Sequence, residues 1–192
     1  QLLDTQYRMN AEIIAFSNHY FYGNQLKTFA SNHDLCLEGD DLKAVEFIDT
    51  AGCGYEESKH PETGAIFNES EISIIEQRVQ QLKSDQLAII TPYRAQLTKI
   101  RQRIPQVNAN TIDSFQGQEQ DVIIISLCRC NEVNEIGFLK DYRRMNVAFT
   151  RARKKLIVIG DSITIGQDEF YRSFLEHIEQ NGSYRSAWEF MD

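Results

Sequence analysis

Four short apolar runs rich in Val and Ile recur along the chain. They are VEFID (45–49), LAIIT (87–91), DVIIISLC (121–128) and KLIVIG (155–160). Continuous apolar runs of this length, without polar alternation, are typical of strands that are buried on both faces of a parallel sheet. The pattern therefore predicts four strands of one mostly parallel sheet.

Helical periodicity fills the intervals between these strands. After the candidate N-cap residues Asn68 and Ser70, one helix is predicted to bury Ile72, Ile75, Val79 and Leu82. Further helices are predicted over about 92–103, with Leu97 and Ile100 facing inward and Pro105 beyond the end, and over 140–153. A C-terminal helical extension is predicted over 166–182, with Phe170, Phe174, Leu175 and Ile178 on one face and Gly182 as its stop. The stretch AEIIAFSNHYFY (11–22) is expected to be helical too.

Alternating strands and helices predict an α/β fold with a mostly parallel sheet flanked by helices. With 192 residues, of which 42% are hydrophobic and 25% charged, the chain is expected to form one domain over residues 1–192. Ligands of such sheets gather at the carboxyl ends of the strands, where we therefore expect the site. Residues 52–68 are predicted to form a long loop.

Composition excludes several classes of protein. No apolar run approaches a membrane span, and the start of the chain lacks a basic signal region and an initiating methionine. We therefore expect a soluble, intracellular protein, cytoplasmic or nuclear, cut from a longer chain. The four cysteines and four histidines do not cluster, so we expect reduced thiols and no metal site.

Charge is distributed unevenly. The net charge is −8, which by itself argues against a polyanionic partner. Residues 140–155 nevertheless hold seven basic residues and one acid, so this segment carries +6 and the rest of the chain −14. A concentrated basic segment matters more for phosphate binding than the total charge does.

Four polar segments carry candidate chemistry. Gln6-Tyr7-Arg8 offers an aromatic ring for a base and a guanidinium for a phosphate, and Thr91-Pro92-Tyr93-Arg94 follows a predicted strand. Each has a plain structural alternative: a core Tyr beside a surface Arg, and a strand-to-helix turn with Pro in its first turn.

The other two segments are longer and more specific. Residues 111–121, TIDSFQGQEQD, are polar for most of their length and lead into a buried strand. Gly117 permits close backbone approach, while Ser114, Gln116 and Glu119 offer hydrogen-bonding groups. Residues 142–153, YRRMNVAFTRAR, place Arg144 and Arg151 two turns apart on one face of a predicted helix, where a solvated basic face is the alternative.

In this order, QYRMN, TPYRAQ, TIDSFQGQEQDVIIIS and RRMNVAFTRARKKLIVIGD resemble the second, C-terminal RecA-like lobe of superfamily 1 helicases. The resemblance covers about residues 2–161 and favours the branch with nonsense-mediated-decay RNA helicases and 5′-to-3′ DNA helicases. It implies a RecA-like, P-loop NTPase-type fold. The partners it implies are single-stranded DNA or RNA and an N-terminal RecA-like lobe of the same full-length protein.

The resemblance also implies roles for individual residues. Tyr7 would lie near the adenine of ATP, Arg8 at the γ-phosphate, and Glu119 at the ribose, with Gly117 beside the nucleotide. Arg151 would be the arginine finger, and Arg144 would brace the site. Single-strand contacts would come from Thr91, Pro92, Tyr93, Thr111 and Ser114.

Departures from a complete motor are equally informative. The chain has no G-x-x-x-x-G-K-[ST] motif and no strand ending in Asp-Glu, so ATP and Mg²⁺ would be held mainly by the other lobe. We expect this chain alone to be inactive as an ATPase. Only seventeen residues separate Tyr93 from Thr111, which leaves no room for the large insertion of the 3′-to-5′ branch.

Two other functions compete with the motor. One is a non-catalytic nucleic-acid-binding or scaffold module that retains the motor fold, since fold alone does not fix function. The other is a nuclease, which would need clustered acids where this sequence has separated ones. Intact Arg8, Glu119 and Arg151 favour the motor.

Overall fold

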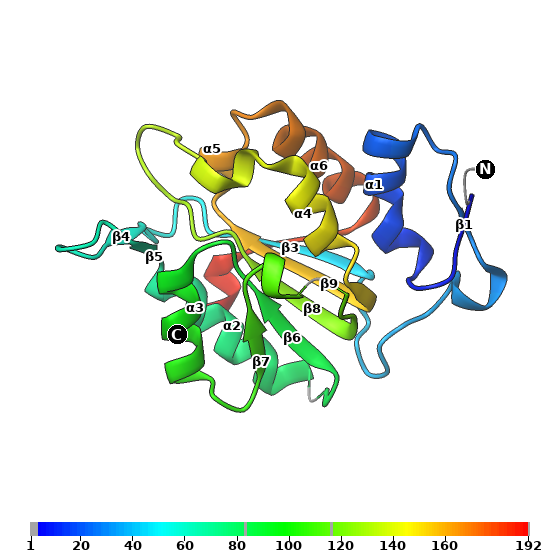
Figure 1. Ribbon diagram of the computed structural model, residues 1–192, viewed down its shortest axis with the longest axis horizontal. Coiled ribbons are helices and arrows are strands. Elements are labelled where there is room, and N and C mark those ends of the chain that lie inside the picture. The colour runs from blue at the N-terminus through cyan, green and yellow to red at the C-terminus, as the bar shows by residue number, and fades with distance from the viewer. Residues whose placement is uncertain (1–3, 83, 116, 192) are drawn as a thin grey trace.

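A six-stranded parallel sheet forms the centre of the computed structural model, which describes residues 4–82, 84–115 and 117–191 (Figure 1). The strand order is β10-β3-β9-β8-β6-β7, and every neighbouring pair is parallel. The strands are β3 (Val45–Asp49), β6 (Leu87–Ile90), β7 (Asn108–Asn110), β8 (Gln120–Ser126), β9 (Ala152–Gly160) and β10 (Ser183–Ser186). All four predicted strands are therefore present at the centre of the sheet, and the α/β, RecA-like fold class is confirmed.

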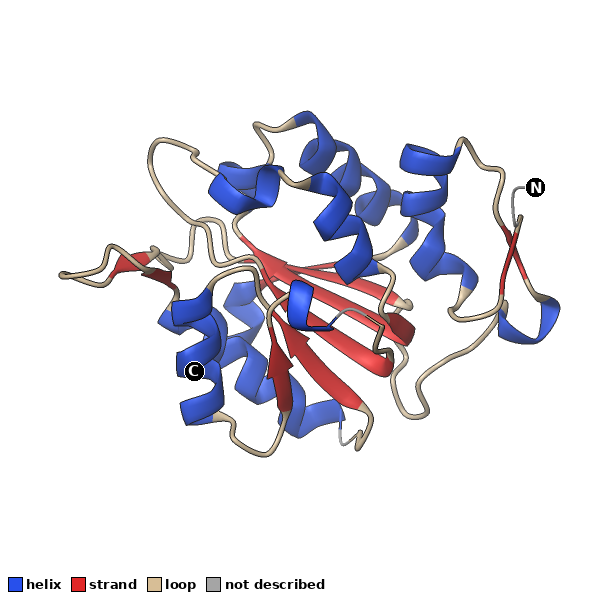
Figure 2. Cartoon of the chain, viewed as in Figure 1, coloured by secondary structure: helices blue, strands red, loops and turns tan. Residues whose placement is uncertain are grey.

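Helices cover both faces of this sheet (Figure 2). One face packs against α1 (Ala11–Tyr22), α4 (Tyr142–Phe149), α5 (Ser162–Ile165) and α6 (Glu169–Asn181). The other packs against α2 (Glu69–Leu82), α3 (Arg94–Arg103) and the short 3-10 helix η4 (Ala187–Phe190). Consecutive strand residues point to opposite faces, so that Ile123 and Ile125 of β8 enter one core while Val122 and Ile124 enter the other. Burial on both faces explains why these strands are rich in Val and Ile without polar alternation, apart from Glu46 in β3.

Smaller elements complete the chain. Two two-stranded sheets pair β1 (Thr5–Gln6) with β2 (Lys27–Thr28) and β4 (Ser58–Lys59) with β5 (Ile66–Phe67). Three more 3-10 helices are η1 (Ala30–Asn32), η2 (Asp113–Phe115) and η3 (Gly137–Lys140). The predicted loop over 52–68 therefore contains a β-ribbon, which projects from the body of the molecule in Figure 1.

Three predicted helices differ in extent. The helix predicted over 140–153 ends at Phe149, because β9 already begins at Ala152, which pairs with Gln120 of β8. The C-terminal helical extension predicted over 166–182 corresponds to α6, which begins at Glu169, while α5 ends just before it at Ile165; Asp168 caps α6 through the amides of Phe170 and Tyr171. The helix expected from about residue 92 begins at Arg94, so Pro92 precedes the helix instead of lying in its first turn.

One carboxylate lies fully inside the sheet. Glu46 of β3 is surrounded by the cationic groups of Arg78 (2.8 Å), Lys155 (3.3 Å) and Arg185 (3.3 Å). Arg78 comes from α2 and Arg185 from the edge strand β10, so these ion pairs join the C-terminal strand to the sheet. A buried carboxylate is tolerated only when its charge is compensated in this way.

No helix among the described residues combines the length and the apolar character that a membrane span needs.

Candidate functional site

The β1–β2 pair fixes the backbone around Tyr7 and Arg8. The Gln6 carboxamide oxygen accepts the amides of Arg8 (2.9 Å) and Met9 (3.0 Å), while its nitrogen donates to the Met9 carbonyl (2.8 Å). The Tyr7 side chain points to solvent with 65% of its surface exposed, and its ring lies 4.8 Å from that of Phe29. The ring of Tyr7 is therefore exposed to solvent, and the alternative that Tyr7 is a core residue does not hold.

Arg8, Glu119 and Arg151 form a charged cluster. Arg8 Nε donates to Glu119 Oε2 at 2.6 Å, and Arg8 Nη1 donates to the Thr150 carbonyl at 3.3 Å. Arg151 donates to the Gln118 carbonyl at 3.4 Å, and its Nε is buried without a partner among the described residues. Burial and the neighbouring charge of Arg8 lower the pKa of Arg151, against the opposing effect of Glu119. Two cations therefore share one carboxylate, which leaves the cluster positively charged.

The cluster lies at the amino ends of β8 and β9. Gln120, the first residue of β8, donates its amide to the carbonyl of Arg151, immediately before β9. The expectation that this site would lie at the carboxyl ends is wrong, because α4 ends at Phe149 and the chain enters β9 two residues after Thr150. For the same reason Arg151 does not share a helical face with Arg144. Gly117 adopts φ of +82° in the turn before Glu119, a conformation that favours glycine.

The residues expected to contact nucleic acid lie at the opposite ends of the strands. Pro92, Thr111 and Ser114 line a groove of about 470 Å³ beyond the carboxyl ends of β6 and β7. The Thr111 hydroxyl donates to the Ser114 hydroxyl at 3.0 Å, and Ser114 is exposed. Arg94 is also exposed at the groove. The segment 111–119 thus leads from this groove towards the Arg8–Glu119–Arg151 cluster, although Gln116 within it lies outside the described residues.

Arg144 belongs to the groove. Its Nε lies 3.3 Å from carboxylate oxygens of both Asp113 and Asp141, and its side chain lines the groove. The ion pair with Asp113 joins α4 to the segment 111–119. Among the described residues Arg144 forms no ion pair with Glu119, so its contacts place it with the single-strand candidates and not beside Arg151.

Thr91 and Tyr93 support the groove from below. Thr91 is fully buried, and its hydroxyl accepts the amide of Tyr93 at 3.4 Å. Tyr93 is also buried, and its hydroxyl donates to the Ile136 carbonyl at 3.3 Å. The side chain of Thr91 therefore has no surface for a ligand, and its structural contribution is to hold the turn that presents Pro92.

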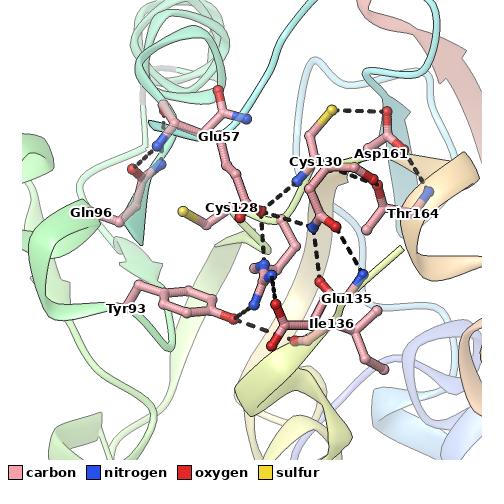
Figure 3. Close-up of polar contacts among 12 residues, drawn as sticks. Glu57, Tyr93, Gln96, Cys128, Cys130, Glu135, Ile136, Asp161 and Thr164 are labelled. Atoms are coloured by element: carbon pink, nitrogen blue, oxygen red, sulfur yellow. Dashed lines mark hydrogen bonds and ion pairs between the residues drawn. The ribbon is translucent and has the colours of Figure 1, made fainter. Parts of the chain in front are cut away.

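A buried ionic network behind Tyr93 was missed by sequence reasoning (Figure 3). Arg129 donates to Glu57 at 2.8 Å, lies 3.3 Å from a carboxylate oxygen of Glu135, and donates to the Tyr93 hydroxyl at 3.3 Å. Glu57 comes from the segment predicted as a loop, and Arg129 follows β8. An arginine directly after the apolar run 121–128 was the available signal, but its partner Glu57 is 72 residues away in sequence.

Within the described ranges, no group of three or more Asp, Glu, His or Cys side chains could hold a metal ion. The four cysteines are free thiols.

Comparison with known proteins identifies the family. Residues 1–163 match the AAA domain family. The chain belongs to the superfamily 1 helicases, as a C-terminal RecA-like lobe of the nonsense-mediated-decay branch.

Curated relatives of this helicase lobe include the DNA polymerase alpha-associated DNA helicase A of Saccharomyces cerevisiae, 33% identical over 96% of this chain and 31% of that protein. The DNA-binding protein SMUBP-2 of Rattus norvegicus is 31% identical over 100% of this chain and 21% of its own length. The putative helicase MOV-10 of Gallus gallus is 30% identical over 93% of this chain and 22% of its own length. The helicase lobe thus spans less than a third of these relatives.

Proposed function

We propose that this helicase lobe works in an ATP-dependent motor on single-stranded DNA or RNA. It would supply the arginine finger and part of the strand contacts, while an N-terminal RecA-like lobe would hold most of the ATP and Mg²⁺. The observation that carries the proposal is the charged cluster of Arg8, Glu119 and Arg151. It presents two guanidinium groups at the amino ends of β8 and β9.

The cluster fits a nucleotide phosphate. The positive charges of Arg8 and Arg151 repel each other, and the buried Nε of Arg151 is without a partner among the described residues. An anion between them would relieve the repulsion and accept the free N–H. Arg8 would hold the γ-phosphate, and Arg151 would donate to the oxygens on which negative charge develops, which for an arginine finger is worth roughly 10³- to 10⁵-fold in rate.

The remaining nucleotide contacts follow from position. The exposed ring of Tyr7 would pack against the adenine, and the Glu119 carboxylate would accept hydrogen bonds from the ribose. Glu119 also holds Arg8 in place through their 2.6 Å ion pair. Gly117 would let the backbone approach the nucleotide closely.

The strand contacts would lie at the groove. Thr111 and Ser114 offer hydroxyls to phosphate oxygens, Arg94 and Arg144 offer positive charge, and Pro92 forms part of the wall. Thr91 and Tyr93 would shape this surface from beneath. Because 111–119 connects the groove with the Glu119 end of the cluster, a shift of the strand would be transmitted to Arg8 and Arg151.

The test is nucleic-acid-stimulated ATP hydrolysis by the full-length protein that contains this lobe, compared with the lobe alone. We expect turnover that rises when single strands are added to the full-length protein, and no turnover by the isolated lobe. Full-length protein that binds single strands but hydrolyses no ATP would refute the motor and leave the non-catalytic nucleic-acid-binding module in its place.

A further inference from the structure

Phe138 is the large exposed aromatic side chain at the groove. It lines the groove opposite the ends of β6 and β7, and 68% of its surface is accessible to solvent. Ile136, two residues before it, and Leu139, directly after it, are both buried in the core. A ring held in water between two buried residues leaves an apolar surface uncovered at the groove, which indicates a ligand or partner.

The backbone beneath Phe138 is fixed on both sides. On one side Tyr93 donates to the Ile136 carbonyl, and on the other the buried hydroxyl of Tyr171 donates to the Leu139 carbonyl at 2.8 Å. Gly137 has φ of +53°, and a Cβ at this position would collide with the Arg129 guanidinium. The short helix η3 therefore presents the Phe138 ring from a rigid base.

The ring itself rests on Tyr93. The two ring centroids are 5.7 Å apart in an edge-to-face arrangement, and the Tyr93 hydroxyl is held by Arg129. Arg129, only 2% exposed, is in turn fixed between Glu57 and Glu135. This buried network of ion pairs and hydrogen bonds fixes the position of Tyr93. It thereby holds the Phe138 ring in place beside the groove.

The chemistry of the groove identifies what the ring would meet. Hydroxyls of Thr111 and Ser114 and the exposed cation of Arg94 suit a phosphate backbone, while the charge of Asp113, which also lines the groove, is balanced by Arg144. A chain of phosphates with flat apolar groups attached is a single-stranded nucleic acid, whose bases stack on aromatic side chains in proteins of this kind. An apolar protein segment would make no use of the Arg94 cation.

We propose that Phe138 stacks against an unpaired base of the strand in this groove, and that Glu57 and Arg129 are positioning residues acting through Tyr93. The proposal rests on the proposed function, since it needs a single strand at the groove. It adds a base contact to a set of residues that otherwise addresses only the phosphates and sugars. Because every base has a flat aromatic face, the contact would be indifferent to sequence.

The test is a binding cycle between protein and strand, carried out with the full-length protein. Wild type and Phe138→Ala are titrated with a labelled poly-thymidine oligonucleotide and with the same backbone carrying abasic sites throughout. Stacking of one base is worth about 5- to 150-fold in affinity. We expect Phe138→Ala to weaken binding of the intact strand by a factor in this range and to bind the abasic strand as wild type does.

Two further variants separate stacking from structure. Phe138→Trp keeps an aromatic face and is expected to retain the affinity of wild type for the intact strand. Val133→Ala removes another exposed apolar side chain, 79% accessible, from the same β8–α4 connection and is expected to change neither affinity. For Arg129→Met, which loosens Tyr93, we expect the same selective loss on the intact strand as for Phe138→Ala, in a smaller degree.

The outcomes distinguish the two proposals. Wild-type protein that binds neither strand contradicts the proposed function. Wild-type protein that binds the intact strand, with Phe138→Ala binding it equally tightly, overturns the stacking proposal alone and assigns the ring to a protein contact. Equal losses on intact and abasic strands also overturn it, because a stacking residue cannot act on a base that is absent.

Discussion

Glu71 gives the sharpest test of the buried framework beneath the groove. It is fully buried on α2, where its carboxylate accepts the Ser126 hydroxyl at 2.5 Å and the Cys128 amide at 3.0 Å. Cys128 has φ of +69°, so Glu71 holds the strained residue from which the chain turns towards Arg129. Burial raises the pKa of Glu71 from 4.5 to about 8, against the opposing effect of its hydrogen bonds to Ser126 and Cys128.

The sign of the pH dependence follows from this pKa. Between pH 4.5 and about 8 the folded chain keeps a proton on Glu71 that the unfolded chain releases. The resulting stability is fully present below about pH 4.5 and is lost as the pH rises through about 8. Each pH unit within that window is worth about 1.4 kcal/mol, so between pH 5 and pH 8 the contribution falls by roughly 3 to 4 kcal/mol.

The perturbation is Glu71→Gln, which keeps the size of the side chain and does not titrate. Free energies of unfolding are measured by urea denaturation of the 192-residue chain at pH 5, 6, 7 and 8. We expect the stability of wild type relative to Glu71→Gln to decrease by those 3 to 4 kcal/mol from pH 5 to pH 8. Glu69→Gln, an exposed change on the same helix, is the matched control and should parallel wild type. Parallel curves for wild type and Glu71→Gln would refute the reasoning.

Three further predictions concern packing, charge and binding. Glu46→Gln removes the carboxylate partner of the buried Arg78, while Lys155 keeps Asp40 at 2.9 Å, so urea denaturation should show a loss of about 3–5 kcal/mol. Phe174→Ala removes a buried ring that stacks on Phe149 at 4.8 Å, and a loss of about 3–5 kcal/mol is expected; a loss below 1 kcal/mol would contradict the assigned packing. Single-strand affinity of the full-length protein should fall steeply with salt, with a logarithmic slope of about −0.7 per phosphate contacted, and an affinity that salt leaves unchanged would argue against the groove.

Much of the fold could be predicted from sequence, because a strand that is buried on both faces is apolar along most of its length. The run LAIIT contains no polar residue before its last position, the run VEFID contains only Glu46 before its last position, and α1 occupies the predicted stretch 11–22. The edge strands β7 and β10, NAN and SYRS, were missed because edge strands need little apolar character. Their pairing with β6 and β3 comes from tertiary contacts that local periodicity does not encode.

The sequence indicated which residues belong to the candidate site better than it indicated how they are arranged. The family resemblance placed Arg8, Glu119 and Arg151 at one site, and the structure brings them into one cluster. It also placed Arg144 and Arg151 on one helical face, which is wrong, because strand pairing at Ala152 ends the helix early. A long-range pairing of this kind overrides helix propensity and is not visible in a local pattern.

The central claim is that this helicase lobe brings Arg151 to ATP held by another lobe. The most direct measurement is single-strand-stimulated ATP turnover at saturating ATP by full-length Arg151→Ala, with Arg172→Ala on α6 as the control. We predict a loss of roughly 10³-fold or more for Arg151→Ala and wild-type turnover for the control. Full turnover by Arg151→Ala, in protein that retains its single-strand binding, would contradict the account.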